Sequence, residues 1–271
     1  MRESDYQELL GLLIDVAEAN KSIVAGDDDR VLDAEGLALK FVSHAASALY
    51  LYRGTSVPEL HASFFDAGSV NVVSRAALET FLAFHYVFAD PKSDQDRDYR
   101  YGAWVLARYL EMQKLPVWSA QAKAALEREA RLIEPLRDRL KANSTFDGLT
   151  PGHQKKVLNG EWRLLSWTQI ARSAGLHDIN AKAAYSYLCG YAHAGNLSIL
   201  QLRQAHTSES QRSLCASSMN LVLIAMANMV KSYCVLFPKA MARLDQEPHR
   251  AALVDVWIGV GRAAPQDVLD K

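Results

Sequence analysis

Hydrophobic side chains recur along this sequence with a period near 3.6 residues, the spacing that puts them on one face of an α-helix. Leu9, Leu12, Leu13 and Val16 form one such face, and Ser4 is expected to cap the start of their helix. A half-buried strand would instead alternate apolar and polar residues, and no segment shows that alternation with β-branched side chains. The pattern therefore predicts an all-α protein.

Breaks at proline and glycine divide this pattern into about nine helices, which we expect to form one domain over residues 1–271, built around a helical bundle. Residues 54–68 and 143–161 are expected to be mostly irregular, with a short helix after Pro151. A small C-terminal appendage is predicted within 238–271. The expected helices cover 4–24, 34–53, 70–88, 94–115, 119–142, 167–174, 179–193, 208–236, 238–245 and 248–260.

Composition narrows the class of protein. The chain has 271 residues, 49% of them hydrophobic, and its 30 Lys and Arg nearly balance its 31 Asp and Glu. A formal net charge of −1 creates no global field for nucleic acid or an anionic membrane, so such a contact would need a local patch. The 14 Gly and 8 Pro are too few for a collagen-like or disordered chain. A globular protein is expected.

Several segments bear on the cellular compartment. Residues 1–6 are charged and polar, without the apolar stretch of a signal peptide behind them. The apolar run 214–230 contains serines and asparagines, which favours a buried central helix over a membrane span. Cys189, Cys215 and Cys234 form no C-x-x-C pair, as expected for free thiols in a reducing compartment. The sequence predicts a soluble, cytoplasmic protein.

Motifs for common cofactors and metals are missing from the sequence. It has no G-x-S-x-G, no H-E-x-x-H and no phosphate-binding G-x-x-x-x-G-K-[ST]. Gly259 and Gly261 imitate part of a dinucleotide fingerprint, but no strand precedes them. No two histidines lie four residues apart, and no Glu-x-x-His occurs. We therefore expect neither a metal nor a cofactor.

Residues 167–176 resemble the first helix and the turn of a helix-turn-helix motif. A recognition helix presents Arg, Lys, Asn or Gln to base edges. Here that helix would be 180–188, where Lys182 is the one basic residue among many small apolar ones. Such a surface favours packing against protein, and DNA binding is kept as a second alternative.

A polar stripe crosses the otherwise apolar helix expected at 70–88. At 100° per residue, Arg75, Glu79 and Tyr86 fall on one face of this helix. Arg75 and Glu79 are four residues apart and can form an ion pair. Burying such a pair costs several kcal/mol unless its hydrogen bonds are satisfied. The stripe is either a structural pair or part of a site.

A second polar stripe climbs the helix expected at 179–193. Tyr185, Cys189 and His193 follow one another at steps of four residues, and Gly195 ends the helix. His193 would then lie in the last turn, near the negative end of the helix dipole. A histidine there can act as a general acid and base or can cap carbonyl groups.

These residues carry a resemblance to a known family. Arg75-x-x-x-Glu79 is followed by Trp167, Ala171 and Gly175-Leu176, and then by Tyr185-x-Tyr187 and His193. Together they resemble the bacterial family called domain of unknown function 5677, which is all-helical and has no settled activity. That family is in turn similar to the HEPN superfamily, which contains nucleotide-binding domains and ribonucleases of toxin–antitoxin and phage-defence systems.

The resemblance to HEPN nucleases implies a role for His193. Those enzymes carry an arginine, then four to six residues, and then a catalytic histidine on the same helix. This chain has the histidine, but Ser186 to Cys189 stand where the arginine would be. Arg75, on another helix, is the candidate to replace the missing cation.

Three functions follow from these residues. The leading hypothesis is a ligand- or partner-binding module in prokaryotic stress or defence, acting as a homodimer; the context rests on the resemblance alone. Its ligand would be RNA or a nucleotide-like anion in a pocket between the two polar helices. The first alternative is a metal-independent ribonuclease, with His193 as acid and base, Arg75 stabilising the phosphate and Glu79 orienting Arg75. The second is the DNA binder. The pocket-lining candidates are Tyr86, Tyr185, Tyr187 and Asn196.

Overall fold

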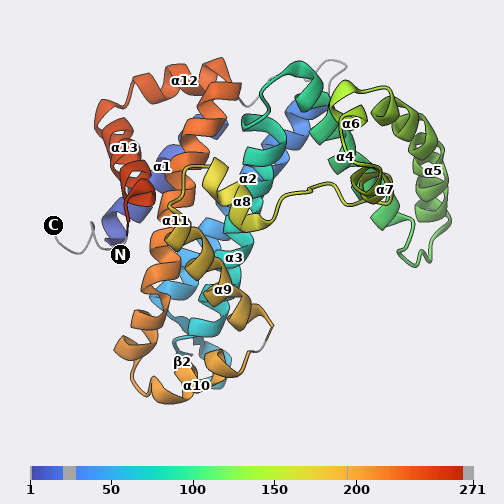
Figure 1. Cartoon of the computed structure of the whole chain (residues 1–271). Coiled ribbons are helices and arrows are strands. Elements are labelled where there is room, and N and C mark those ends of the chain that lie inside the picture. The colour runs from blue at the N-terminus through green and yellow to red at the C-terminus, as the bar shows by residue number, and fades with distance from the viewer. Residues whose placement is uncertain (1, 21–28, 194, 265–271) are drawn as a thin grey trace. The chain divides into compact units, whose positions relative to one another are not determined.

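The chain folds into two units, which a computed structural model describes over residues 2–20, 29–193 and 195–264 (Figure 1). The first unit consists of Met1–His85 and Trp167–Lys271, and the second of Tyr86–Ser166. The second unit is thus an insertion between two helices of the first. The prediction of one domain over the whole chain did not include this division.

The all-α class is confirmed, with thirteen α-helices in the described residues. The predicted count of about nine is too low: the expected ranges, with the short helix after Pro151, already number eleven, and α6 and α10 lie where no helix was expected. The elements of the first unit are α1 (Glu3–Glu18), α2 (Arg30–Arg53), β1 (Thr55–Val57), β2 (Ala62–Phe64), α3 (Ala67–Phe84), α8 (Trp167–Ser173), α9 (Asp178–Ala192), α10 (Asn196–Gln204), α11 (Ser208–Leu236), α12 (Pro238–Asp245) and α13 (Pro248–Arg262).

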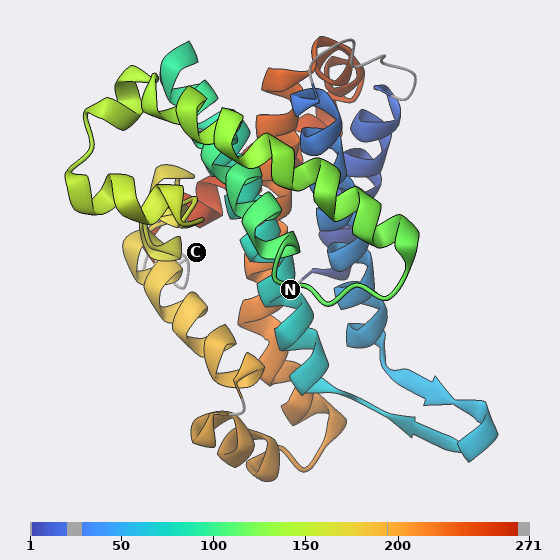
Figure 2. The ribbon, with the colours of Figure 1, turned by 90° about the vertical axis from the view of Figure 1, so that its right-hand side faces the viewer.

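Helix α11 forms the centre of the first unit. It packs against α1, α2, α3 and α13, and its side chains from Leu221 to Ala227 are all buried (Figures 1 and 2). Two segments, Ala67–Ala89 and Ser208–Leu236, are long and apolar enough to cross a membrane by length and composition alone. In this fold 61% and 72% of their most apolar windows are buried inside the protein. Core helices of soluble proteins have the same character.

A β-hairpin interrupts the helical fold between α2 and α3. Strands β1 and β2 pair antiparallel, with Ser56 opposite Ser63, and a short 3-10 turn at Pro58–Leu60 joins them. The hairpin extends away from the ends of the helices (Figure 2). This stretch was expected to be irregular, and the strands were missed because three residues are too few for an alternating pattern.

Several helix ends differ from the prediction, and the ends of α1 and α3 affect residues to which a role was assigned. Helix α1 begins one residue earlier than expected, so Ser4 lies inside it and its hydroxyl donates to Asp5 instead of capping. Its predicted end at Val24 lies outside the described residues. Helix α3 ends at Phe84, and His85–Ala89 form a π-helical turn. A π-turn adds a residue to the helical repeat, so Tyr86 leaves the stripe formed by Arg75 and Glu79.

The C-terminal helices belong to the first unit, where α12 and α13 pack against α1 and α11. Helix α13 approaches α11 closely at Gly261, where an added Cβ would lie 2.5 Å from Cγ2 of Ile224. A glycine at this position therefore lets two helix backbones come together. The part of the predicted appendage after residue 264 lies outside the described residues.

We expect Gly261→Ala to lower the free energy of unfolding by about 1–3 kcal/mol, because the new methyl group overpacks the contact with Ile224. The matched control is Gly259→Ala, two residues earlier on the same helix, where an added Cβ meets nothing within 4 Å. That change should stabilise the helix by about 0.5–1 kcal/mol, the usual gain of alanine over glycine. Urea denaturation of both variants measures the difference, and equal effects would contradict the close approach.

The second unit has its own core. Its helices are α4 (Asp94–Met112), α5 (Ala120–Lys141), α6 (Ser144–Asp147) and α7 (Pro151–Leu158). The outer face of α5 is exposed, as its alternating charges predicted. The buried side chains that hold the unit together are Tyr99, Ala103, Leu106, Ile133, Leu140, Phe146 and Val157.

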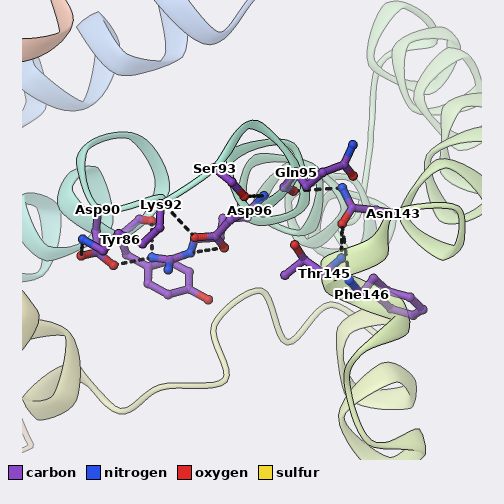
Figure 3. A network of polar contacts seen from close by, with 10 residues as sticks. Tyr86, Asp90, Lys92, Ser93, Gln95, Asp96, Asn143, Thr145 and Phe146 are labelled. Carbon is purple, nitrogen blue, oxygen red and sulfur yellow. Dashed lines mark hydrogen bonds and ion pairs between the residues drawn. The ribbon is translucent and has the colours of Figure 1, made fainter.

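A polar network fixes the start of α4 in this unit. Figure 3 shows Tyr86, Asp90 and Asp96 gathered there. Arg100 joins them: its Nη1 donates to Oδ2 of Asp90 at 2.7 Å and to the carbonyl of Tyr86 at 3.1 Å, and its Nε donates to Asp96 at 2.8 Å. The guanidinium also lies over the ring of Tyr86, 4.5 Å from its centroid. Arg100 is thus the hub of the unit's polar contacts.

Candidate functional site

Four polar side chains from two helices meet in the first unit. Nη1 of Arg75, on α3, lies 3.0 Å from Nε2 of His193, the residue that follows α9. Nε of Arg75 donates to Oε1 of Glu79 at 3.0 Å. The hydroxyl of Tyr185 donates to the same carboxylate oxygen at 3.0 Å, and it lies 3.4 Å from Nη2 of Arg75. The structure therefore brings together Arg75, Glu79, Tyr185 and His193, which we call the Arg75 cluster.

The positions of Arg75 and Glu79 follow from helix geometry. They are four residues apart on α3, so their side chains lie one turn above each other and can pair. The surrounding side chains of α3, from Ala77 to Phe84, are nearly all buried, and this apolar packing fixes the helix next to α9. Because the apolar face of α3 is buried, the pair of Arg75 and Glu79 lies on the side of α3 that faces α9.

His193 is held by the turn that ends α9. Its amide donates to the carbonyl of Cys189 at 3.0 Å, which makes it the C-terminal cap of the helix. The carbonyl of Gly190 accepts from the amide of Gly195 at 2.7 Å and from the hydroxyl of Ser198 at 3.2 Å. Ser198 is buried and was missed from the sequence, since a lone serine gives no pattern. These contacts hold Gly195 and Ser198 against the last turn of α9, close to His193.

The contact between Arg75 and His193 determines the form of the imidazole. A guanidinium carries five N–H donors and no acceptor. Nε2 of His193 must therefore accept the hydrogen bond, which places the ring proton on Nδ1. The geometry holds a neutral imidazole next to a cation.

The charge states of Arg75 and Tyr185 are well defined. Burial alone would lower the pKa of Arg75, but the hydrogen bond and the negative charge of Glu79 outweigh it, so this pKa is raised above its usual value. Burial and then the charge of Glu79 raise the pKa of Tyr185 to about 12. At neutral pH Arg75 is therefore a cation and Tyr185 a neutral phenol.

The Arg75 cluster still has donors for a ligand. Three of the five N–H groups of Arg75 point to Glu79, His193 and Tyr185, so one N–H on each terminal nitrogen has no partner in the described residues. The side chain of Arg75 is 17% exposed and that of Glu79 29%, and His193 is exposed. A planar anion can reach the two remaining N–H groups, as phosphates and carboxylates do at arginines.

The structure does not bring the other predicted ligand-binding residues to this cluster. Tyr86 belongs to the second unit, where its ring packs against Trp162 and Arg100. The hydroxyl of Tyr187 donates to the carbonyl of Leu214 at 2.8 Å, because residues two apart on a helix point in different directions. Asn196 is exposed at the first residue of α10. Of the predicted tyrosines, Tyr185 alone contacts Arg75 in the described part of the chain.

Metal-binding side chains and cysteines are less suited than the Arg75 cluster to form a functional site in the described residues. In the described residues no group of three or more His, Cys, Asp or Glu side chains is placed to hold a metal ion. Cys215 and Cys234 are buried, and burial raises the pKa of these thiols to about 12 and about 11. A thiol is a nucleophile in its ionised form, so neither is suited to attack a substrate at neutral pH.

A cavity of about 430 Å³ lies elsewhere in the first unit, and none of the predicted site residues lines it. Arg172, His177 and Arg262 form part of its wall. Arg172 pairs with Asp178, which offsets its charge. The Arg75 cluster combines a cation, an imidazole and a phenol in direct contact, so it is the candidate site.

The segment that resembles a helix-turn-helix forms α8 and α9, which pack against each other. Helix α9 also packs against α3, so one of its faces is used inside the first unit. Lys182 is its one basic residue, and it is exposed. The arrangement of α8 and α9 adds no feature that favours the recognition of DNA bases.

The comparisons with known proteins point to one family. A family model described as a family of unknown function (DUF5677) matches residues 62–211, which include all four members of the Arg75 cluster. No curated protein and no solved structure gives a significant match. Because the matched residues make up more than half of the chain, the protein belongs to the DUF5677 family of unknown function.

Proposed function

We propose that the protein binds a phosphate-bearing ligand, a nucleotide or an RNA, at the Arg75 cluster. The observation that carries this proposal is the 3.0 Å contact between Nη1 of Arg75 and Nε2 of His193. It places two groups that bind phosphate side by side at an accessible position. The expected setting, prokaryotic stress or defence, comes from the family resemblance and is part of the proposal.

The chemistry of phosphate recognition fits the cluster. A phosphate can accept from the two terminal N–H groups of Arg75 that remain available, in the bidentate manner that arginine favours. The phenol of Tyr185 stays protonated, and its one O–H can turn from Glu79 to a phosphate oxygen. His193 would then give up its contact with Arg75 and turn its ring so that Nδ1–H donates to a phosphate oxygen. Glu79 keeps Nε of Arg75 in place and leaves the outer edge of the guanidinium to the ligand.

Binding is tested with three probes: inorganic phosphate, ATP and a fluorescently labelled RNA oligonucleotide. Arg75→Gln should weaken the binding of the recognised probe about 10- to 100-fold, since a hydrogen bond to a charged group contributes about 1.5–3 kcal/mol. Isothermal titration calorimetry measures the small probes, and fluorescence anisotropy measures the RNA. The probe that binds distinguishes a nucleotide site from an RNA site.

Lys182→Gln is the matched control, because it removes one positive charge from α9 outside the cluster. It should leave the affinity nearly unchanged. Equal losses in Arg75→Gln and Lys182→Gln would indicate nonspecific attraction to positive charge and would contradict the proposal. The same holds if no probe binds at about 1 mM, where the binding free energy has fallen to about −4 kcal/mol.

A metal-independent ribonuclease is the second candidate function. The specific observation in its favour is that Nε2 of His193 accepts from Arg75, since the lone pair that makes this contact can serve a general base once Arg75 turns to the phosphate. Arg75 would stabilise the charge that develops on the phosphate, and Glu79 would orient Arg75. In this arrangement the arginine and the histidine would come from two helices, whereas HEPN nucleases carry both on one helix.

A further inference from the structure

We infer that the outer face of α2 is a dimer interface, and that a second copy of this chain packs there with the two α2 helices parallel. This inference is independent of the proposed function. It rests on the spacing of exposed residues on α2, on a glycine within that face, and on the charges beside it.

The exposed face of α2 has the spacing of a coiled-coil seam. Three large apolar side chains on α2 are well exposed: Leu32 to 52%, Leu39 to 66% and Tyr50 to 66%. They lie on one stripe with three small residues, at intervals of four, three, four, three and four residues. We call these six exposed residues the outer seam: Leu32, Gly36, Leu39, Ser43, Ala46 and Tyr50.

The opposite face of α2 shows what such spacing does in this fold. Its buried residues follow the same intervals, and they pack inside the first unit, mainly against α3. The seam that they form is Ala34, Ala38, Phe41, Ala45 and Ala48. Helix α2 therefore has two seams of the same period on opposite sides, and the described residues cover one of them. A second copy of the chain would cover the other.

Gly36 adds a separate reason to expect a neighbour. It lies inside α2, where glycine weakens a helix relative to alanine. In the described residues an added Cβ at Gly36 would meet no atom within 4 Å, so the surface of α2 is open at this point of the outer seam. A glycine in a helix interface lets the two backbones approach closely. A partner helix on the outer seam supplies that missing contact.

Charges beside the seam specify the partner and its direction. In heptad terms Gly36 is an a position, so Glu35 is a g position and Lys40 the following e position. Neither side chain has an ion-pair partner in the described residues. In a parallel pair of α2 helices, g contacts the e position five residues later on the partner, so Glu35 of each chain meets Lys40 of the other. Antiparallel pairing with full overlap would instead bring the two Lys40 side chains together.

The apolar part of the interface is tested with the full chain by sedimentation equilibrium. Wild type should be a dimer, and Leu39→Glu should be a folded monomer, because Leu39 is exposed in the protomer and the change removes no contact inside it. Val256→Glu on α13 is the matched control: it places the same charge at another exposed apolar position of the first unit and should leave the dimer intact.

The direction of pairing is tested by exchanging the charges. E35K and K40E should each weaken the dimer about five- to tenfold, because each turns two attractive contacts into repulsive ones. An equimolar mixture of the two should recover wild-type affinity as a heterodimer, in which both contacts are again attractive. A loss in K40E without a loss in E35K would overturn the parallel arrangement.

A wild-type chain that sediments as a monomer would overturn the whole inference. A dimer that survives Leu39→Glu would do the same, because it would place the interface elsewhere on the molecule. Circular dichroism of each variant separates loss of dimer from loss of fold.

Discussion

Replacing Arg100 with methionine is expected to lower the free energy of unfolding of the second unit by about 3–5 kcal/mol, the usual cost of removing one partner from a buried ion pair. Arg100 is 13% exposed and bonds to Asp90, Asp96 and the carbonyl of Tyr86. Without the guanidinium, Asp96 loses its counter-ion, and Asp90 is left with Lys92, whose side chain is 78% exposed. Chemical denaturation followed by the fluorescence of Trp104 and Trp162 measures the change.

Arg97→Met is the matched control on the same helix. Arg97 also pairs with an aspartate, Asp94, but its side chain is 46% exposed, and surface pairs of this kind contribute about 0–1 kcal/mol. Arg100→Lys should fall between the two variants, because lysine keeps the charge but not the fork of donors. A loss at Arg100 no larger than the loss at Arg97 would show that the network is not what stabilises the unit.

The helices that can be predicted from this sequence are those with long apolar faces and clear breaks. The bounds of α11 and α12 follow from hydrophobic spacing and from Pro238, which begins α12. The hairpin at β1 and β2 could not be predicted, because each strand has three residues. The π-turn after Phe84 could not be predicted either, since it changes the helical repeat without a proline or glycine to mark it.

The candidate site, like the fold, could be predicted from the sequence only in part. The pairing of Arg75 with Glu79 is local and follows from their spacing on one helix. The contact of Arg75 with His193 joins residues 118 positions apart, so it depends on how α3 packs against α9. Tyr86 was assigned to the site on the assumption of a continuous helix, and the π-turn removes it from that face. Sequence pattern therefore identifies candidate groups, and tertiary packing decides which of them meet.

The two arginine networks of this chain differ in a way that bears on function. Arg100 is surrounded by acceptors that belong to its own unit, and its role there is structural. Arg75 uses part of its donors inside the protein and keeps one N–H on each terminal nitrogen for another molecule. Its neighbour His193 is exposed, so replacing this histidine frees one more N–H of Arg75 at the edge of the cluster that water can reach. His193 can therefore be changed to test chemistry without a large loss of stability.

The ribonuclease candidate predicts that wild-type protein cleaves end-labelled structured RNA in EDTA and that His193→Ala lowers the rate about 10²- to 10⁴-fold, the usual contribution of a general base. His193 would take the proton of a ribose 2′-hydroxyl as that oxygen bonds to phosphorus and the bond to the 5′-oxygen breaks. The 5′-oxygen would take a proton from water, leaving a 2′,3′-cyclic phosphate and a 5′-hydroxyl.

The control for this experiment is Lys182→Ala, purified in parallel, which should cleave like wild type because Lys182 lies outside the Arg75 cluster. A melting curve of His193→Ala that matches wild type excludes unfolding as the cause of lost activity. Equal cleavage by wild type and His193→Ala would assign the activity to another site or to a contaminant. Cleavage by none of the proteins, with phosphate or nucleotide binding intact, would remove the acid–base role of His193 and leave the Arg75 cluster as a binding site, because binding needs the arginine donors and not a proton acceptor.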